Sequence, residues 1–115
     1  MGLARELRDR RKIEIRKIEV PEWGDKGKPF VMYCGTLSCY DLSRIQKRHP
    51  SFLTNPSIDA MIDLIVLKAA DKSGEKLFTS AEDRIDLMGE ETTVISEIAN
   101  QMFAEIENPE TVEKN

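Results

Sequence analysis

The most continuous run of apolar residues in the chain spans residues 55–71 and predicts a buried helix. Asn55 is of the type that caps helix N-termini, and Pro56 suits the first helical position, where its missing N–H loses no partner. The apolar residues that share one helical face are Ile58, Met61, Ile62, Ile65 and Ala69. Because further apolar residues occupy the other faces, we expect this helix at the centre of the domain, with the other elements packed around it.

Two stretches nearer the N-terminus predict a β-hairpin. Residues 12–20 alternate between apolar and charged side chains, but the phase of the alternation changes once. Two explanations remain open: a β-bulge at Arg16 and Lys17 restores a single apolar face, or the strand begins only at about Arg16. We expect Pro21 to end this strand and residues 30–34 to form the second one. Two strands alone are marginal in water, so the hairpin must pack on helices.

Capping chemistry predicts two short helices on either side of the central one. Ser38 and Asp41 have the spacing of a capping box, and the helix that they start should end near Arg48, ahead of Pro50. The second helix begins near residue 80, where two overlapping capping pairs fit, namely Thr79 with Glu82 and Ser80 with Asp83. Gly89 in the left-handed conformation would close it. Just before it, Leu77 and Phe78 form an apolar anchor that would serve as a third strand.

The last predicted helix begins near Thr92 and ends before Pro109. Its apolar residues recur at helical spacing and are Val94, Ile95, Ile98, Ala99, Met102, Phe103 and Ile106. Residues 107–115 are expected to form a frayed acidic tail, and residues 1–11 either a helical turn or two or a mobile basic arm. A chain of 115 residues predicts a single domain, residues 1–115. The fold class is therefore α+β, mainly helical, with an N-terminal β-hairpin packed on four to five helices around the central buried helix 55–71.

The charge of the chain is distributed unevenly along its length. The net charge of −4 argues against a dedicated nucleic-acid binder. Residues 1–20 carry seven basic and four acidic side chains, whereas residues 81–115 carry two basic and ten acidic ones. Opposite charges at the two ends predict a homo-oligomer that assembles head to tail and weakens with salt. The alternative is that both ends are merely solvated surface.

The cysteines and the hydropathy of the chain indicate in which cellular compartment the protein is expected. Two cysteines and no secretory signal at the N-terminus predict a reducing cytosol with free thiols. The apolar run at 55–71 is interrupted by charge and shorter than the roughly 20 residues that a bilayer requires, so we expect no membrane partner.

No combination of residues predicts catalysis, a cofactor or a metal centre. Cys34, Cys39 and His49 are three potential zinc ligands, but their spacing fits no common zinc module, and two small buried thiols are the better interpretation of the cysteines. His49 lacks partners for a catalytic triad. Residues 71–75 resemble a calcium loop superficially, yet no bidentate Glu follows at the twelfth position, and a turn after the central helix explains them.

Four apolar side chains are candidates for binding a partner protein. Trp23 lies in a loop and is either an exposed contact anchor or a residue folded under one end of the core with its N–H bonded to backbone. Met102, Phe103 and Ile106 end the last apolar stripe and belong either to the core or to an interface.

Two motifs resemble a known family, the tail assembly chaperones of long-tailed, siphovirus-type bacteriophages. Val20-Pro21-Glu22-Trp23-Gly24 at the close of the first strand is similar to the opening of these proteins. So are the segment from Ala69 to Thr79, which follows the apolar helix, and the acidic helix that ends in Asp86-Leu87-Met88-Gly89. The likeness covers residues 17–106, most of the chain.

The resemblance implies a late, non-enzymatic protein of virion assembly that acts in the host cytoplasm and is absent from the mature virion. Members keep the tape measure protein soluble until tail tube subunits polymerise around it, and they tend to form oligomers. A longer form, made by ribosomal frameshift, engages the tail tube protein. The rival functions are a small DNA-binding regulatory protein that uses the basic N-terminus and a structural head–tail connector component of the virion.

Overall fold

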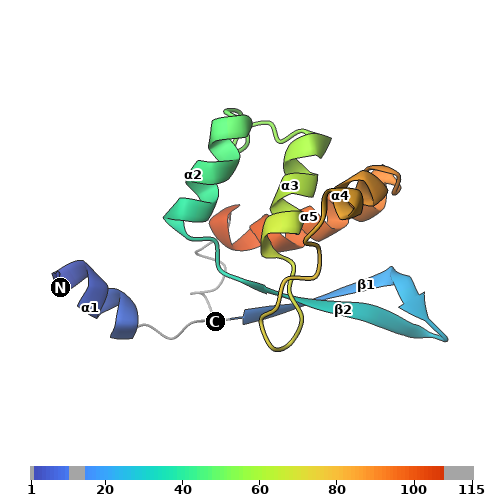
Figure 1. Cartoon of the computed structure of the whole chain (residues 1–115), viewed down its shortest axis with the longest axis horizontal. Coiled ribbons are helices and arrows are strands. Elements are labelled where there is room, and N and C mark those ends of the chain that lie inside the picture. The colour runs from blue at the N-terminus through green and yellow to red at the C-terminus, as the bar shows by residue number, and fades with distance from the viewer. Residues whose placement is uncertain (1, 11–14, 108–115) are drawn as a thin grey trace.

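The chain folds as an α+β, mainly helical domain in which a β-hairpin lies under a layer of helices (Figure 1). The computed structural model describes residues 2–10 and 15–107, with side chains up to residue 103. The elements are α1 (Leu3–Arg10), β1 (Ile15–Asp25), β2 (Lys28–Gly35), α2 (Cys39–Arg48), α3 (Ile58–Lys68), α4 (Ala81–Met88) and α5 (Thr92–Glu107). The predicted fold class is confirmed. Residues 108–115, predicted to be a frayed tail, lie outside the described residues.

The hairpin presents one apolar face to the helices. Its two strands pair antiparallel in an unbroken register from Ile15 opposite Gly35 to Val20 opposite Phe30, so no bulge interrupts Arg16 and Lys17. The side chains that this face buries are Ile18, Val20, Met32 and Cys34, whereas Ile15 is exposed. Of the two explanations for the phase change, the structure supports a strand that begins at about Arg16, since Arg16, Ile18 and Val20 share the face that points to the helices.

The prediction that Pro21 ends the first strand is wrong. β1 continues through Pro21 to Asp25, with a shift in register between Val20 and Asp25. Proline is tolerated there because an irregular, edge position needs no N–H for the ladder. The strands are joined at Lys26 and Gly27, whose φ values of 52° and 80° are typical of a tight hairpin turn.

Helix α3 lies at the centre of the helical layer and packs against α2, α4 and α5. Its buried side chains are Ala60, Ile62, Leu64 and Ile65. The predicted start is wrong, because Ser57 caps the helix by accepting a hydrogen bond from the N–H of Ala60 at 3.1 Å. Asn55 belongs to the turn that precedes the helix, where its backbone N–H donates to Ser51 O at 2.7 Å. Pro56 precedes the helix.

The capping chemistry of α2 and α4 is largely as predicted. Ser38 and Asp41 form a complete capping box, and α2 ends at Arg48. At α4 the Ser80 and Asp83 pair forms, and Asp83 also accepts the N–H of Thr79. Gly89 is not left-handed, because its φ is −85° and its N–H bonds directly to Asp86 and Leu87 carbonyls. This tight closure lets the chain enter α5 within three residues.

The connection between α3 and α4 contains no third strand. Ala70 alone bridges Tyr33 of β2 on one side and Lys76 on the other. The predicted anchor at Leu77 and Phe78 packs on the core, half-buried. Residues 71–75 form the expected turn, in which Asp71 Oδ1 accepts the N–H groups of Ser73 and Glu75.

The two ends of the described chain differ in how well they are packed. Helix α5 buries the predicted stripe from Val94 to Phe103 against the hairpin and α3. Helix α1 buries no side chain and stands away from the helical layer (Figure 1). The described residues 3–10 are helical, whereas the mobility of this segment stays a prediction.

Candidate protein-interaction groove

Trp23 is folded against the domain rather than projecting from it. Its ring makes edge contacts with Phe30 and Phe78, with ring centroids 6.1 and 6.3 Å away. Its Nε1–H donates to Glu90 Oε2 at 2.5 Å, so the partner is a carboxylate and not the backbone. The N–H of Glu91, followed by that of Trp23, lowers the pKa of Glu90. Trp23 thus joins the end of β1 to the start of α5.

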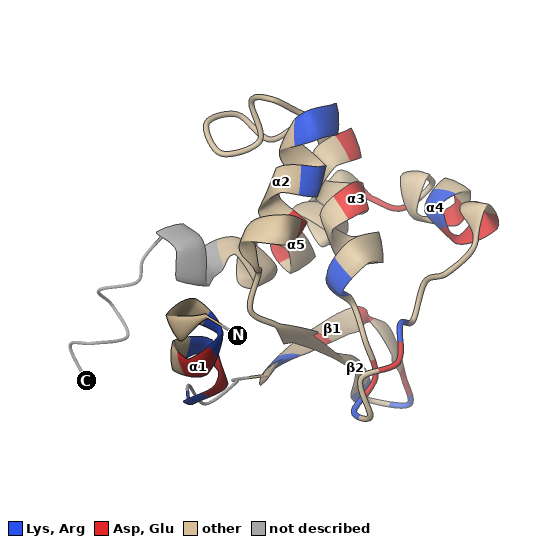
Figure 2. Ribbon diagram, turned by 60° about the vertical axis from the view of Figure 1, so that its left-hand side comes forward, with Lys and Arg blue, Asp and Glu red and all other residues tan. Residues whose placement is uncertain are grey.

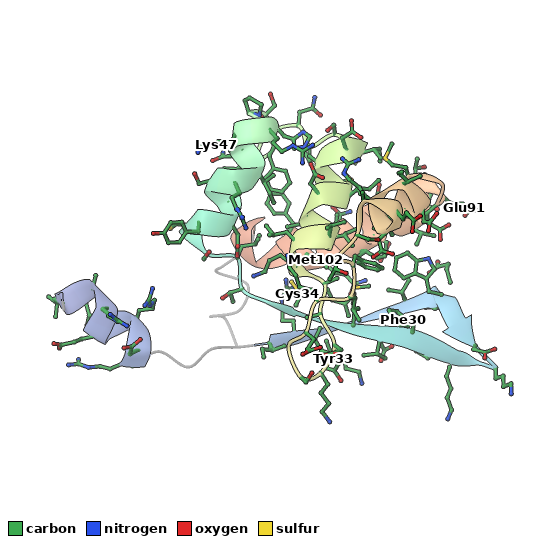
Figure 3. All side chains as sticks on the ribbon, in the orientation of Figure 1. Phe30, Tyr33, Cys34, Lys47, Glu91 and Met102 are labelled. Carbon is green, nitrogen blue, oxygen red and sulfur yellow. The ribbon has the colours of Figure 1, made fainter. Side chains whose placement is uncertain are left out.

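The other predicted partner-binding residues lie in or beside the core. Met102 points into the core (Figure 3) and is buried, as is Phe103. The ring centroids of Phe103 and Phe52 lie 5.1 Å apart. Both side chains therefore serve packing in this fold. Ile106 belongs to α5, but its side chain lies outside the described part of the chain.

A groove of about 280 Å³ runs between β1 and α5. Its floor is apolar and includes Val20 from the strand and Val94 and Ile98 from the helix, all three buried. The exposed carboxylates that line its rim are Glu19, Glu22 and Glu97. Because Val94 and Ile98 are four residues apart, they lie on one face of α5, and the floor follows the axis of that helix.

Arg16 connects the hairpin to α5 beside this groove. From the second residue of β1, near the open end of the hairpin, its guanidinium donates to the carbonyls of Gln101 and Met102, the second at 2.7 Å. Both carbonyls belong to the C-terminal half of α5, where a cation interacts favourably with the helix dipole. One side chain thus holds α5 across β1, and the groove lies alongside.

A second polar cluster ties the helices together. Asp63 of α3 accepts a hydrogen bond from Arg84 Nε of α4 at 2.8 Å, and His49 Nε2 lies 2.7 Å from the other oxygen of the same carboxylate. Arg48 Nη1 lies 3.4 Å away. Burial alone would raise the pKa of Asp63, but the hydrogen bonds from Arg84 and His49 and the nearby positive charges outweigh it, so this pKa is lowered. The cluster explains His49 as a structural partner. An acid in the middle of a mainly apolar helix is the sequence signal that indicates such a cluster.

The two cysteines have different environments. Cys34 is buried as predicted, but Cys39 is exposed, because it occupies the first turn of α2 on the solvent side. Among residues 2–10, 15–103 no group of three or more His, Cys, Asp or Glu side chains is placed to hold a metal ion. None of the described helices is long and apolar enough to cross a membrane.

Comparisons with family models, with curated proteins and with solved structures found no match for this chain.

Proposed function

We propose that the chain is a non-catalytic phage tail assembly chaperone that keeps the tape measure protein soluble by holding helical segments of it in the β1–α5 groove. The observation that carries the proposal is the groove itself, with an apolar floor at helical spacing and three carboxylates on its rim. The motif resemblance around Trp23 lies at the same place, since Glu22 lines the groove and Trp23 closes the end of β1.

The chemistry of the groove selects a particular type of client. An apolar side chain that enters it leaves water, which stabilises binding by roughly 1.5–3 kcal/mol for a Leu or Met. Lys or Arg residues flanking that side chain meet the rim formed by Glu19, Glu22 and Glu97, which orients the segment. A groove that takes up only one or two side chains makes a small interface, and small interfaces bind weakly and reversibly. Reversibility suits a chaperone that tail tube subunits must later displace.

Coexpression with the tape measure protein of the same phage tests this proposal. The rim variant Glu22→Lys/Glu97→Lys should bind this client roughly tenfold more weakly, about 1.4 kcal/mol, because attraction becomes repulsion. Asp25→Lys/Glu75→Lys is the matched control, since it changes the net charge equally at exposed positions away from the groove. The measurement is the soluble fraction of the client together with its Kd.

The outcomes separate the site from the function. If wild type and control keep the client soluble and the rim variant does not, the groove is the client site. If all three keep it soluble equally well, the client binds elsewhere. A wild-type chain that leaves the client insoluble overturns the chaperone function.

The rival function, DNA binding through the basic N-terminus, is less well supported. In α1 the arginines alternate with acids, and Arg8 and Arg10 lie 4.0 Å from Asp9 and Glu6. These pairs reduce the positive charge offered to phosphates. A mobility shift with duplex DNA at low salt is the discriminating measurement, and we expect none.

A further inference from the structure

Helix α1 has the features for which the β1–α5 groove is suited. Leu3 and Leu7 are 67% and 48% exposed, and their spacing of four residues places them on one helical face. The last turn of α1 is basic, with Arg8 and Arg10, and no side chain of the helix is buried. The helix is thus a short apolar and basic segment, which is the chemistry that we propose for a client of the groove.

The helix and the groove match in size. An eight-residue helix is roughly 12 Å long, and the α5 wall of the groove, from Val94 to Gln101, is roughly 10 Å long by the same rise per residue. Val94 and Ile98 on the floor have the same spacing as Leu3 and Leu7. Two helices that lie side by side can therefore place one apolar pair over the other.

The charges of the two surfaces are complementary. Every charged side chain that lines the groove is a glutamate. In α1, Arg8 and Arg10 lie 4.0 Å from Asp9 and Glu6, but all four side chains are at least 60% exposed. Such exposed ion pairs contribute little to stability, so the arginines can exchange these partners for the rim carboxylates at little cost.

The groove lies within reach of α1 in the same copy. Figures 1 and 2 show α1 beyond the open end of the hairpin, and α5 ends toward the same side of the domain. The chain from Arg10 to Ile15 spans at most roughly 18 Å. The groove begins at Glu19, four residues or roughly 13 Å along β1 from Ile15. The connection therefore brings Arg10 level with Glu19 without being fully extended.

We propose that α1 folds back along β1 and docks in the β1–α5 groove of its own copy. The bond from Trp23 places the start of α5 beside the end of β1, and the bonds from Arg16 place its C-terminal half beside the start of β1. A helix that returns along β1 is therefore parallel to α5. The first leucine of α1 then lies over Val94 and the second over Ile98.

The contact acts as a regulator of the groove, and this consequence rests on the function proposed above. If the groove is the client site, α1 occupies it in place of the client. The client then binds only chains whose groove is open, so its apparent affinity falls in proportion to the open fraction. The groove stays covered until a client segment displaces α1.

Paramagnetic relaxation measured by NMR on the full chain tests the contact. A nitroxide is attached at Ala4→Cys in a Cys39→Ser background, which removes the exposed thiol and leaves the buried Cys34. The label should broaden the amide signals of residues 94–98 in α5 more than those of residues 85–88 in α4. When nitroxide and isotope label are on different chains of a mixture, the broadening should disappear, because the contact lies within one copy.

Variants identify the side chains that make the contact. Leu3→Ser/Leu7→Ser should abolish the broadening at residues 94–98. Tyr40→Ser/Leu53→Ser, which removes two exposed apolar side chains elsewhere, is the matched control and should retain it.

The affinity for the tape measure protein tests the regulation. Leu3→Ser/Leu7→Ser should bind this client roughly threefold more tightly than wild type or more, because its groove is always open. The control Tyr40→Ser/Leu53→Ser should bind as wild type does. An unchanged affinity of the leucine variant would overturn the regulation.

The contact and the proposed function can fail separately. Docking of α1 in the groove is overturned if residues 94–98 are not broadened, if α4 is broadened instead, or if broadening occurs only between chains. These results do not depend on any client. Broadening at residues 94–98 together with a client that no variant binds would support the contact and overturn the chaperone function.

Discussion

Asp63 is the residue on which the arrangement of three helices depends. It lies on α3, and it binds Arg84 of α4 and His49 at the end of α2. Its side chain is only 12% exposed, so without these partners the carboxylate would be poorly solvated. The partly buried charge of Asp63 therefore helps to specify how α2 and α4 pack on α3, which apolar contacts alone would leave less defined.

Replacing this carboxylate should destabilise the fold measurably. Asp63→Asn should lower the free energy of unfolding by about 2 kcal/mol, because hydrogen bonds to charged groups are lost while partial exposure screens them. Asp59→Asn is the control, since its side chain is 58% exposed and lies 3.8 Å from Arg84. In urea unfolding, Asp59→Asn should lower the free energy of unfolding by less than about 0.5 kcal/mol. Equal effects of the two substitutions would contradict the role given to Asp63.

The same carboxylate should make stability depend on acidity. Its pKa in the folded state lies below the ordinary value of 3.8, so its contribution is fully present above that value and is lost as the pH falls through the folded-state pKa. We expect the difference in unfolding free energy between wild type and Asp63→Asn to be full at neutral pH and to shrink below about pH 4. If this difference in unfolding free energy stayed constant down to pH 2, the negative charge of Asp63 would not contribute to stability.

At this scale the sequence indicates which residues are unusual but not what they bind. Trp23 and Asp63 are conspicuous in the chain, yet their partners Glu90 and Arg84 are distant in sequence. Packing of whole elements brings these groups together, and no local pattern contains that information. Cys39 is a case where residue type misleads. Cysteine is usually buried, but Cys39 is exposed because it lies at the start of α2.

At the scale of elements, the hairpin depends on a glycine that allows two backbones to meet. A Cβ on Gly24 would collide with the carbonyl of Lys28 and with Pro29 across the turn, whereas a Cβ on Gly35 would contact nothing. Gly24→Ala should therefore cost about 2 kcal/mol through overpacking, and Gly35→Ala less than about 0.5 kcal/mol. Thermal unfolding of both variants measures this, and a Gly24→Ala variant as stable as wild type would mean that the hairpin end relaxes freely.

Elements were predictable where local chemistry decides them. The capping boxes at Ser38 and Ser80 formed as expected, because donor and acceptor are three residues apart. Predictions failed where the sequence offers a second local solution. Ser57 caps α3 in place of Asn55, and β1 passes Pro21 because β2 resumes pairing beyond it. The β1–α5 groove was not predictable at all, since Glu22 and Glu97 meet only after the hairpin and last helix pack.

At the scale of the whole molecule, the distribution of charge should govern association. If the opposite charges of residues 1–20 and 81–115 drive self-association, raising NaCl from 0.1 to 1 M should weaken it at least threefold, because the Debye length falls from about 10 to about 3 Å. Light scattering at several protein concentrations measures this. Association that strengthened with salt would assign the contact to apolar surface alone.

The bond from Arg16 to α5 also bears on how the protein is made. It joins groups 85 residues apart in the chain, and the hairpin that it clamps is marginal without a helical cover. At roughly 5–20 residues per second, a ribosome needs several seconds to add the intervening segment. During that interval the apolar side of the hairpin has no α5 to cover it. The native state thus becomes available only once residue 103 has left the exit tunnel.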